Sequence, residues 1–166
     1  MVTNPYIIPA DSVSVLHTGH SHVEVLTPPD LVASEGISVM RGTVDGPGVV
    51  PLHSHRARES FYVLDGEMEV YQESEGSASW TVVRPGDYVV VPCNSRHAWR
   101  NSSSAACVVL IITDSEVTAF LQGSSDIEKA GLSVGEATGK IMDIAATYHL
   151  WLATPEQNSA IGITFP

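Results

Sequence analysis

Hydrophobic and polar residues alternate in short runs along the first two thirds of the chain, and Gly, Pro, Ser and Asn separate these runs. Short alternating runs at such close spacing are typical of the strands of a β-sandwich or barrel. No helical period is sustained between Val13 and Thr113. The sequence therefore predicts an all-β fold with strands at 12–17, 22–26, 37–44, 60–64, 67–72, 80–83, 88–91 and 107–113.

The connections between these runs carry turn residues. Asp65-Gly66 predicts a tight hairpin, and the stretch 84–87, with Pro at its second position and Gly at its third, predicts a β-turn. The polar stretch 73–79 predicts an exposed hairpin tip. We therefore expect neighbouring strands to run antiparallel.

The pattern changes after Thr113. Asp114 as an N-cap and Gly123 as a C-cap delimit a short helix. Apolar residues at spacings of three and four predict a second helix, on the face formed by Ile141, Ile144, Ala145, Tyr148 and Leu152. We expect a single domain over 1–166, with the barrel at about 12–113 and a helical extension at about 114–166. The apolar helix face is expected to pack on the barrel or on a partner subunit.

Composition narrows the classes of partner. The 166 residues are 43% hydrophobic and 16% charged, with a formal charge of −11 that repels phosphate backbones and anionic lipid. Nucleic acid and membranes are therefore not expected as partners. The first ten residues lack a signal-peptide pattern, and the longest apolar run, 105–112, is far shorter than the roughly 20 residues of a membrane span. With two cysteines and no disulfide framework, we expect a cytoplasmic protein.

The chemistry centres on two histidines and a glutamate. His53 and His55 are two residues apart, so on a strand both rings project from the same face. Glu59 follows after a short turn, where a returning strand can direct its carboxylate toward the imidazoles. Two neutral imidazoles and a carboxylate suit a divalent transition metal.

A His-x-His pair is a weak signal by itself. The chain contains a second pair, His20 and His22, with His17 close by. Strand histidines are more often half-buried polar residues than ligands. We interpret these three and His149 as ordinary polar residues.

Two longer stretches carry a family pattern. Residues 48–66 follow the order Gly, His-x-His, Glu, Gly, and residues 86–101 follow the order Gly, Pro-x-Asn, His, Asn. They resemble the first and second motifs of the cupin superfamily, firmly over 37–113. The chain departs from the pattern at Gly48, which leaves four residues before His53 rather than five, and at Asn94, which replaces a glycine. Asn is the non-glycine residue that best tolerates a left-handed backbone.

The cupin resemblance implies a jelly-roll antiparallel β-barrel with a metal held by three histidines and one glutamate. His97 stands at the second-motif ligand position, so the implied ligands are His53, His55, Glu59 and His97. The resemblance leaves the metal open among iron, manganese, nickel, copper, cobalt and zinc. It also implies a homodimer.

Two classes of function fit this resemblance. One is a metal-dependent oxidoreductase, similar to quercetinase-like dioxygenases, or a cupin-type isomerase or cyclase, acting on a small aromatic or apolar substrate. Glu59 then doubles as a proton acceptor, and Phe61 and Trp99, which alternation turns inward, line the substrate pocket. The other class is a non-catalytic small-molecule binding or sensory module, because fold does not fix function.

Overall fold

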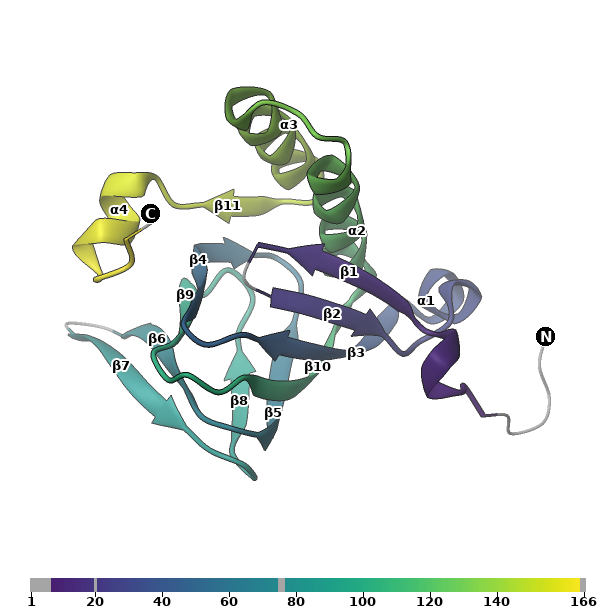
Figure 1. Cartoon of the computed structure of the whole chain (residues 1–166), viewed down its shortest axis with the longest axis horizontal. Coiled ribbons are helices and arrows are strands. Elements are labelled where there is room, and N and C mark those ends of the chain that lie inside the picture. Colours follow the sequence, from purple (N-terminus) through teal and green to yellow (C-terminus); the bar gives the residue numbers. More distant parts are fainter. Residues whose placement is uncertain (1–6, 20, 75–76, 165–166) are drawn as a thin grey trace.

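The structure is a computed structural model that describes residues 7–164, apart from 20, 75 and 76. Two antiparallel β-sheets face each other and form a barrel, with helices at its ends (Figure 1). The predicted all-β fold is confirmed. The six-stranded sheet runs β1 (Ser14–Thr18), β2 (Ser21–Val25), β3 (Ile37–Val44), β10 (Cys107–Asp114), β5 (Glu59–Asp65), β8 (Tyr88–Val91). The five-stranded sheet runs β11 (Leu150–Leu152), β4 (Gly48–His55), β9 (His97–Asn101), β6 (Met68–Ser74), β7 (Ser77–Val83).

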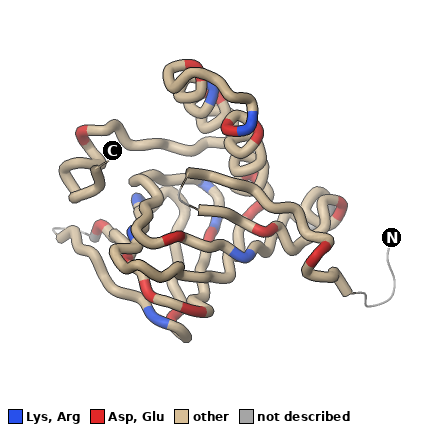
Figure 2. The backbone as a smooth tube through the Cα atoms, in the orientation of Figure 1, with Lys and Arg blue, Asp and Glu red and all other residues tan. Residues whose placement is uncertain are grey.

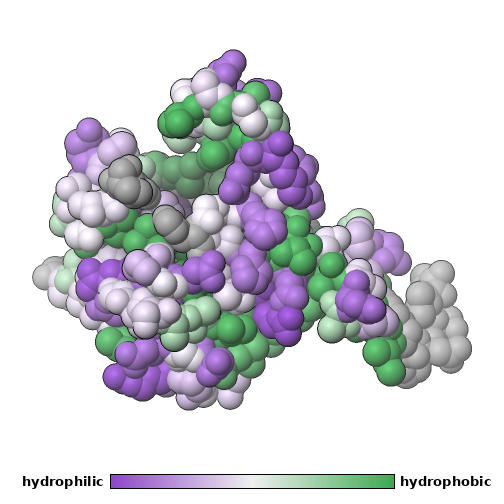
Figure 3. Space-filling view, viewed as in Figure 1, coloured by the Kyte–Doolittle hydropathy of each residue, from purple (hydrophilic) through white to green (hydrophobic). Residues whose placement is uncertain are grey.

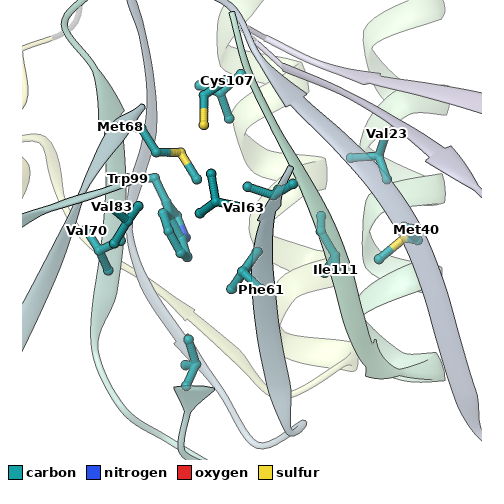
Figure 4. Close-up of a cluster of buried hydrophobic side chains, with 13 residues drawn as sticks. Val23, Met40, Phe61, Val63, Met68, Val70, Val83, Trp99, Cys107 and Ile111 are labelled. Carbon is teal, nitrogen blue, oxygen red and sulfur yellow. The ribbon is translucent and has the colours of Figure 1, made fainter. Parts of the chain in front are cut away.

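The core lies between the two sheets. Along β3 every second residue is buried, beginning with Ser38 and Met40, as expected for a strand with one face turned inward. Figure 4 shows the buried side chains that meet from both sheets. This cluster comprises Val23, Met40, Val44, Phe61, Val63, Met68, Val70, Val83, Val91, Trp99, Cys107, Val109 and Ile111.

Helices at 29–35 and at 155–160 were not predicted. A 3-10 turn (Ala10–Ser12) precedes β1, and the helix α1 (Pro29–Glu35) lies between β2 and β3. α1 has Pro29 at its first position, and Gly36 ends it in the left-handed conformation with φ of 71°. Both residues are start and stop signals of a helix, but seven residues are too few to show an apolar period.

The C-terminal helices differ from the predicted bounds. Helix α2 (Ser115–Lys129) continues through Gly123, where an added Cβ would lie 3.1 Å from Ile144 of α3 (Val134–Thr147). Gly123 therefore permits two helices to approach closely and is not a C-cap. The predicted second helix is confirmed as α3, but Leu152 lies in β11, because the chain leaves the helix after Thr147 and pairs with β4. The helix α4 (Pro155–Ala160) follows.

The two predicted turns join strands of different sheets. At 84–87 the backbone N–H of Asp87 donates to Arg84 O at 2.9 Å, so the predicted β-turn is confirmed. The turn at Asp65-Gly66 is not a hairpin, because β5 pairs with β10 and β8 while β6 pairs with β7 and β9. Gly66 has φ of 72°, and a Cβ there would lie 2.4 Å from Ala106 O. The hairpin predicted at 73–79 joins β6 to β7, with 75 and 76 outside the described residues.

Basic and acidic residues are scattered along the backbone of both the sheets and the helices (Figure 2). In Figure 1, β11 runs between α3 and α4. Figure 3 shows hydrophobic residues at the surface in this region. Over the described ranges, no helix is long and apolar enough to cross a lipid bilayer.

Candidate metal centre

Three histidines come together from two neighbouring strands. His53 and His55 lie on β4, and His97 is the first residue of β9, where it stands opposite His53. One ring nitrogen from each lies within 4.8 Å of the other two. Alternation along β4 explains the pairing of His53 with His55, and the antiparallel register with β9 adds His97.

Glu59 reaches the same point from the opposite sheet, as the first residue of β5. Its Oε2 atom lies 3.1 Å from Nε2 of His55 and 3.4 Å from Nε2 of His97. Glu59, His55 and His97 are buried, whereas His53 is partly exposed. The structure therefore groups the three histidines as possible ligands and places the Glu59 carboxylate beside two of them, His55 and His97.

The backbone fixes the orientation of all three rings. Nδ1 of His53 donates to Pro51 O at 2.7 Å, Nδ1 of His55 to Ala57 O at 2.9 Å, and Nδ1 of His97 to Ser95 O at 2.9 Å. A carbonyl oxygen only accepts, so the proton of each neutral ring resides on Nδ1. The Nε2 atoms are thereby left with the lone pairs that a metal ion requires.

Electrostatics keeps Glu59 ionised. Burial alone would raise its pKa, but the hydrogen bond from His55 and the neighbouring His97 ring lower the pKa of Glu59 to about 2. Burial would likewise lower the pKa of His55, yet its hydrogen bond to the Glu59 carboxylate raises it. Nε2 of His55 and the Glu59 carboxylate, 3.1 Å apart, thus each stabilise the charged form of the other.

His53 behaves differently. Burial, and to a smaller extent the nearby His97 ring, lower its pKa to about 3. The two ring centroids lie 4.1 Å apart. His53 is therefore neutral at physiological pH and able to donate a lone pair.

The residues present fit a divalent transition metal. Nε2 of His97 is buried and has no hydrogen-bond partner, although a buried polar atom is normally paired. In their neutral forms the three imidazoles offer Nε2 lone pairs, and with the ionised carboxylate they form a donor set that such ions accept. An ion among them would give His97 the partner that it lacks.

Phe61 and Trp99, predicted to line a substrate pocket, lie directly beside this group. Phe61 follows Glu59 by two residues on β5, and Trp99 follows His97 by two residues on β9, so both face the interior. Their ring centroids are 4.3 Å apart in an edge-to-face arrangement. Both belong to the buried core (Figure 4).

The other histidines and the cysteines lie outside this group. His17 and His22 stand opposite each other on β1 and β2, and His20 lies outside the described residues. Cys93 is exposed and Cys107 is buried, and burial raises the pKa of Cys107 to about 11.

Sequence reasoning did not find the groups that orient the three rings. These acceptors are main-chain carbonyls of Pro51, Ala57 and Ser95. Every residue has a carbonyl, so its role depends on backbone geometry and leaves no signal in the residue types.

Comparison with known proteins places the fold. The family model described as Cupin domain matches residues 40–113. The polyketide cyclase RemF from Streptomyces resistomycificus has a similar structure, with 18% identity and a TM-score of 0.57, covering 68% of this chain and 80% of that one. No curated protein matches the chain.

Two further solved structures are similar. An oxalate decarboxylase from Lactobacillus farciminis has 19% identity and a TM-score of 0.57, covering 68% of this chain but 34% of its own length. An RmlC-like cupin from Shewanella frigidimarina has 15% identity and a TM-score of 0.55, covering 67% of this chain and 91% of that one. At such identities the likeness concerns the fold alone. The family match therefore identifies residues 40–113 as a cupin domain, and the solved structures share its fold.

Proposed function

We propose that the chain is a metal-dependent oxidoreductase of the dioxygenase-like kind, acting on a small aromatic or apolar substrate. We propose that the metal is held by Nε2 of His53, His55 and His97 and by the carboxylate of Glu59. The observation that supports this most strongly is that Nδ1 of all three rings is bonded to the backbone, while Nε2 of His55 and of His97 lies beside the Glu59 carboxylate.

The proposed ion is iron, manganese, nickel, copper, cobalt or zinc, since imidazole and carboxylate ligands accept each of them. A bound ion would supply Lewis acidity, or redox chemistry toward dioxygen, to a substrate at its open position. The four side chains would hold the ion in place. Because His55, Glu59 and His97 are buried, they would limit the access of bulk water to it.

Glu59 contributes negative charge at Oε2. A group with a pKa of about 2 is a weak base at neutral pH, so Glu59 acts as a proton acceptor only after Oε2 leaves His55 and His97. We propose the ligand role as the first function of Glu59 and proton transfer as the second.

Phe61 and Trp99 are proposed as the apolar wall of the substrate site. They extend inward from the strands that carry Glu59 and His97, and edge-to-face packing holds the two rings together. A flat aromatic substrate would meet these rings.

The test starts with protein purified without added metal. We expect about one transition-metal ion per chain by elemental analysis, and oxygen consumption with members of a panel of flavonols and catechols. A His97→Ala variant, prepared in parallel, is the control for both signals. Absence of any transition metal would overturn the metal centre.

Oxygen consumption, the second of these two signals, separates the two classes of function. A protein that contains metal and is stabilised by a panel compound, yet consumes no oxygen, is a binding module, an isomerase or a cyclase rather than a dioxygenase. Product analysis by mass spectrometry then distinguishes a rearranged compound from an unchanged one.

A homodimer, which the cupin resemblance implies, remains a prediction. Light scattering on the purified chain should give twice the mass of one chain, which is 17.7 kDa. A mass equal to that of one chain would contradict it.

A further inference from the structure

The strand that carries His53 and His55 is irregular just before them. On β4, Val50 stands opposite Trp99 and His53 stands opposite His97 of β9. The two residues Pro51 and Leu52 therefore face a single residue of the partner strand. This is a β-bulge, a feature that redirects side chains and is frequent next to functional sites.

The bulge determines which way the histidines face. In a regular strand, residues 50 and 53 would point to opposite faces. Here Val50 packs against the barrel core, and His53 also faces inward, beside His97. Leu52 points outward into a second buried cluster that includes Ile163. Without the bulge, either Val50 or the histidine pair would turn away from the barrel interior.

The C-terminal segment makes both backbone hydrogen bonds of Leu52. The N–H of Leu52 donates to Oδ1 of Asn158 at 2.8 Å, and Leu52 O accepts from the N–H of Ala153 at 3.0 Å. Pro51 has no N–H, and its carbonyl accepts from Nδ1 of His53. The bulge is thus held on one side by a candidate ligand and on the other by residues 153–158.

Asn158 is itself firmly placed. Its side chain is 1% exposed, and Nδ2 donates to Ala153 O at 3.2 Å and to Thr154 O at 3.1 Å. Thr154 begins α4 with a capping box to Gln157. All these residues lie outside 40–113, the part of the chain that matches the Cupin domain model.

We propose that Asn158 is a positioning residue for the metal centre. It fixes the bulge at Pro51 and Leu52 and thereby aims His53 and His55 at the ion. This inference rests on the metal centre proposed above and gives the C-terminal segment a role in that centre.

The test uses the full-length chain with cobalt(II) as the probe metal. Affinity comes from competition with a chelator, and the visible spectrum of cobalt reports the coordination geometry. We expect Asn158→Ala to weaken cobalt binding about tenfold or more, as for other groups that orient metal ligands, and to change the spectrum. Asn158→Asp keeps an oxygen that accepts from Leu52 N–H but loses the Nδ2 donors. We expect it to lower the melting temperature and keep the wild-type spectrum.

Trp80→Phe is the matched control. It removes the hydrogen bond from Nε1 of Trp80 to Ile161 O, 2.9 Å long, which holds the same C-terminal segment but involves no backbone group of the bulge. We expect a lower melting temperature with unchanged cobalt affinity and spectrum. An equal loss of cobalt affinity in this control would mean that general loosening is responsible, and would overturn the positioning role.

The outcomes separate the two proposals. A wild-type chain that binds no cobalt overturns the metal centre and this inference with it. Binding in the wild type together with an unchanged affinity and spectrum in Asn158→Ala overturns this inference alone. If Asn158→Ala does not fold, Asn158→Asp decides, since an altered cobalt spectrum in that variant contradicts the role assigned to Oδ1.

Discussion

His53 and His55 lie on one strand with their ring centroids 5.7 Å apart, and His17 and His22 face each other across β1 and β2 at 6.1 Å. By spacing alone the two pairs are alike. Their surroundings are different. His55 is buried beside the buried carboxylate of Glu59, whereas His17 is exposed.

Ring orientation is the second difference. Nδ1 of His53 and of His55 is bonded to a carbonyl, while among the described residues no hydrogen bond fixes the ring of His17 or His22. In the same part of the chain, only the first pair belongs to a group of three possible ligands. The comparison teaches that closeness of two imidazoles is not sufficient. A metal site also needs oriented rings and a third donor from another strand.

The largest effect on metal binding is expected from a substitution of His97. Replacing His97 by Ala removes the donor that β9 contributes, and we expect metal affinity to fall by more than about a hundredfold, beyond the loss seen when an orienting group is removed. Far-ultraviolet circular dichroism should show a retained fold. Full metal content in His97→Ala, by elemental analysis, would contradict the proposed centre.

Stability offers a measure independent of metal analysis. An ion that binds only the folded chain should stabilise it by about 2.7 kcal/mol at a concentration one hundred times the dissociation constant. For a chain of this size that corresponds to about 5–10 °C in melting temperature. Differential scanning calorimetry should show this shift in the wild type and lose it in His55→Ala. A shift of equal size in His55→Ala would place the ion elsewhere.

Glu59→Gln tests the carboxylate alone. The amide keeps the shape of the side chain but carries no negative charge, so we expect the affinity for a divalent ion to fall about tenfold, the lower end of the range for altered metal surroundings. Isothermal titration with cobalt(II) measures this change. An unchanged affinity would reduce Glu59 to a partner of His55.

The smallest effect is expected at the second histidine pair. Replacing His20 and His22, the second His-x-His pair of the sequence, together by Gln should leave the metal content per chain unchanged. We expect the free energy of unfolding to change by no more than about 0.5 kcal/mol, a size typical of substitutions that remove no core packing. Elemental analysis and urea denaturation check the two values. Loss of metal in this double variant would assign the ion to the other pair.

Alternation predicted strands such as β3, which bury one face. The predicted ranges omit β4, β9 and β11, and along β4 and β9 buried and exposed residues do not alternate regularly. The sequence nominated His53, His55 and Glu59 from their spacing, and His97 from the cupin resemblance. Leu152 was placed on a helix face because a spacing of four fits both the end of α3 and a new strand. Leu152 lies in a strand because β11 pairs with β4, and this pairing joins segments that are far apart in the sequence.

The bulge and its anchor could not be read from the sequence for the same reason. Alternation relates His53 to His55 but does not show that Val50 faces the same way. Asn158 has an ordinary place at the start of a short helix, and its bond to Leu52 depends on how the chain folds back. Local patterns report on local geometry, whereas these contacts depend on the whole topology.

The three bonds from Nδ1 to the backbone have a thermodynamic consequence. Immobilising a side chain on binding costs about 0.5–1.5 kcal/mol of conformational entropy. The rings of His53, His55 and His97 are already restricted by carbonyls two residues away, so this loss occurs when the chain folds. An arriving ion therefore meets donors that have little rotational freedom left to lose, and more of its coordination free energy remains as affinity.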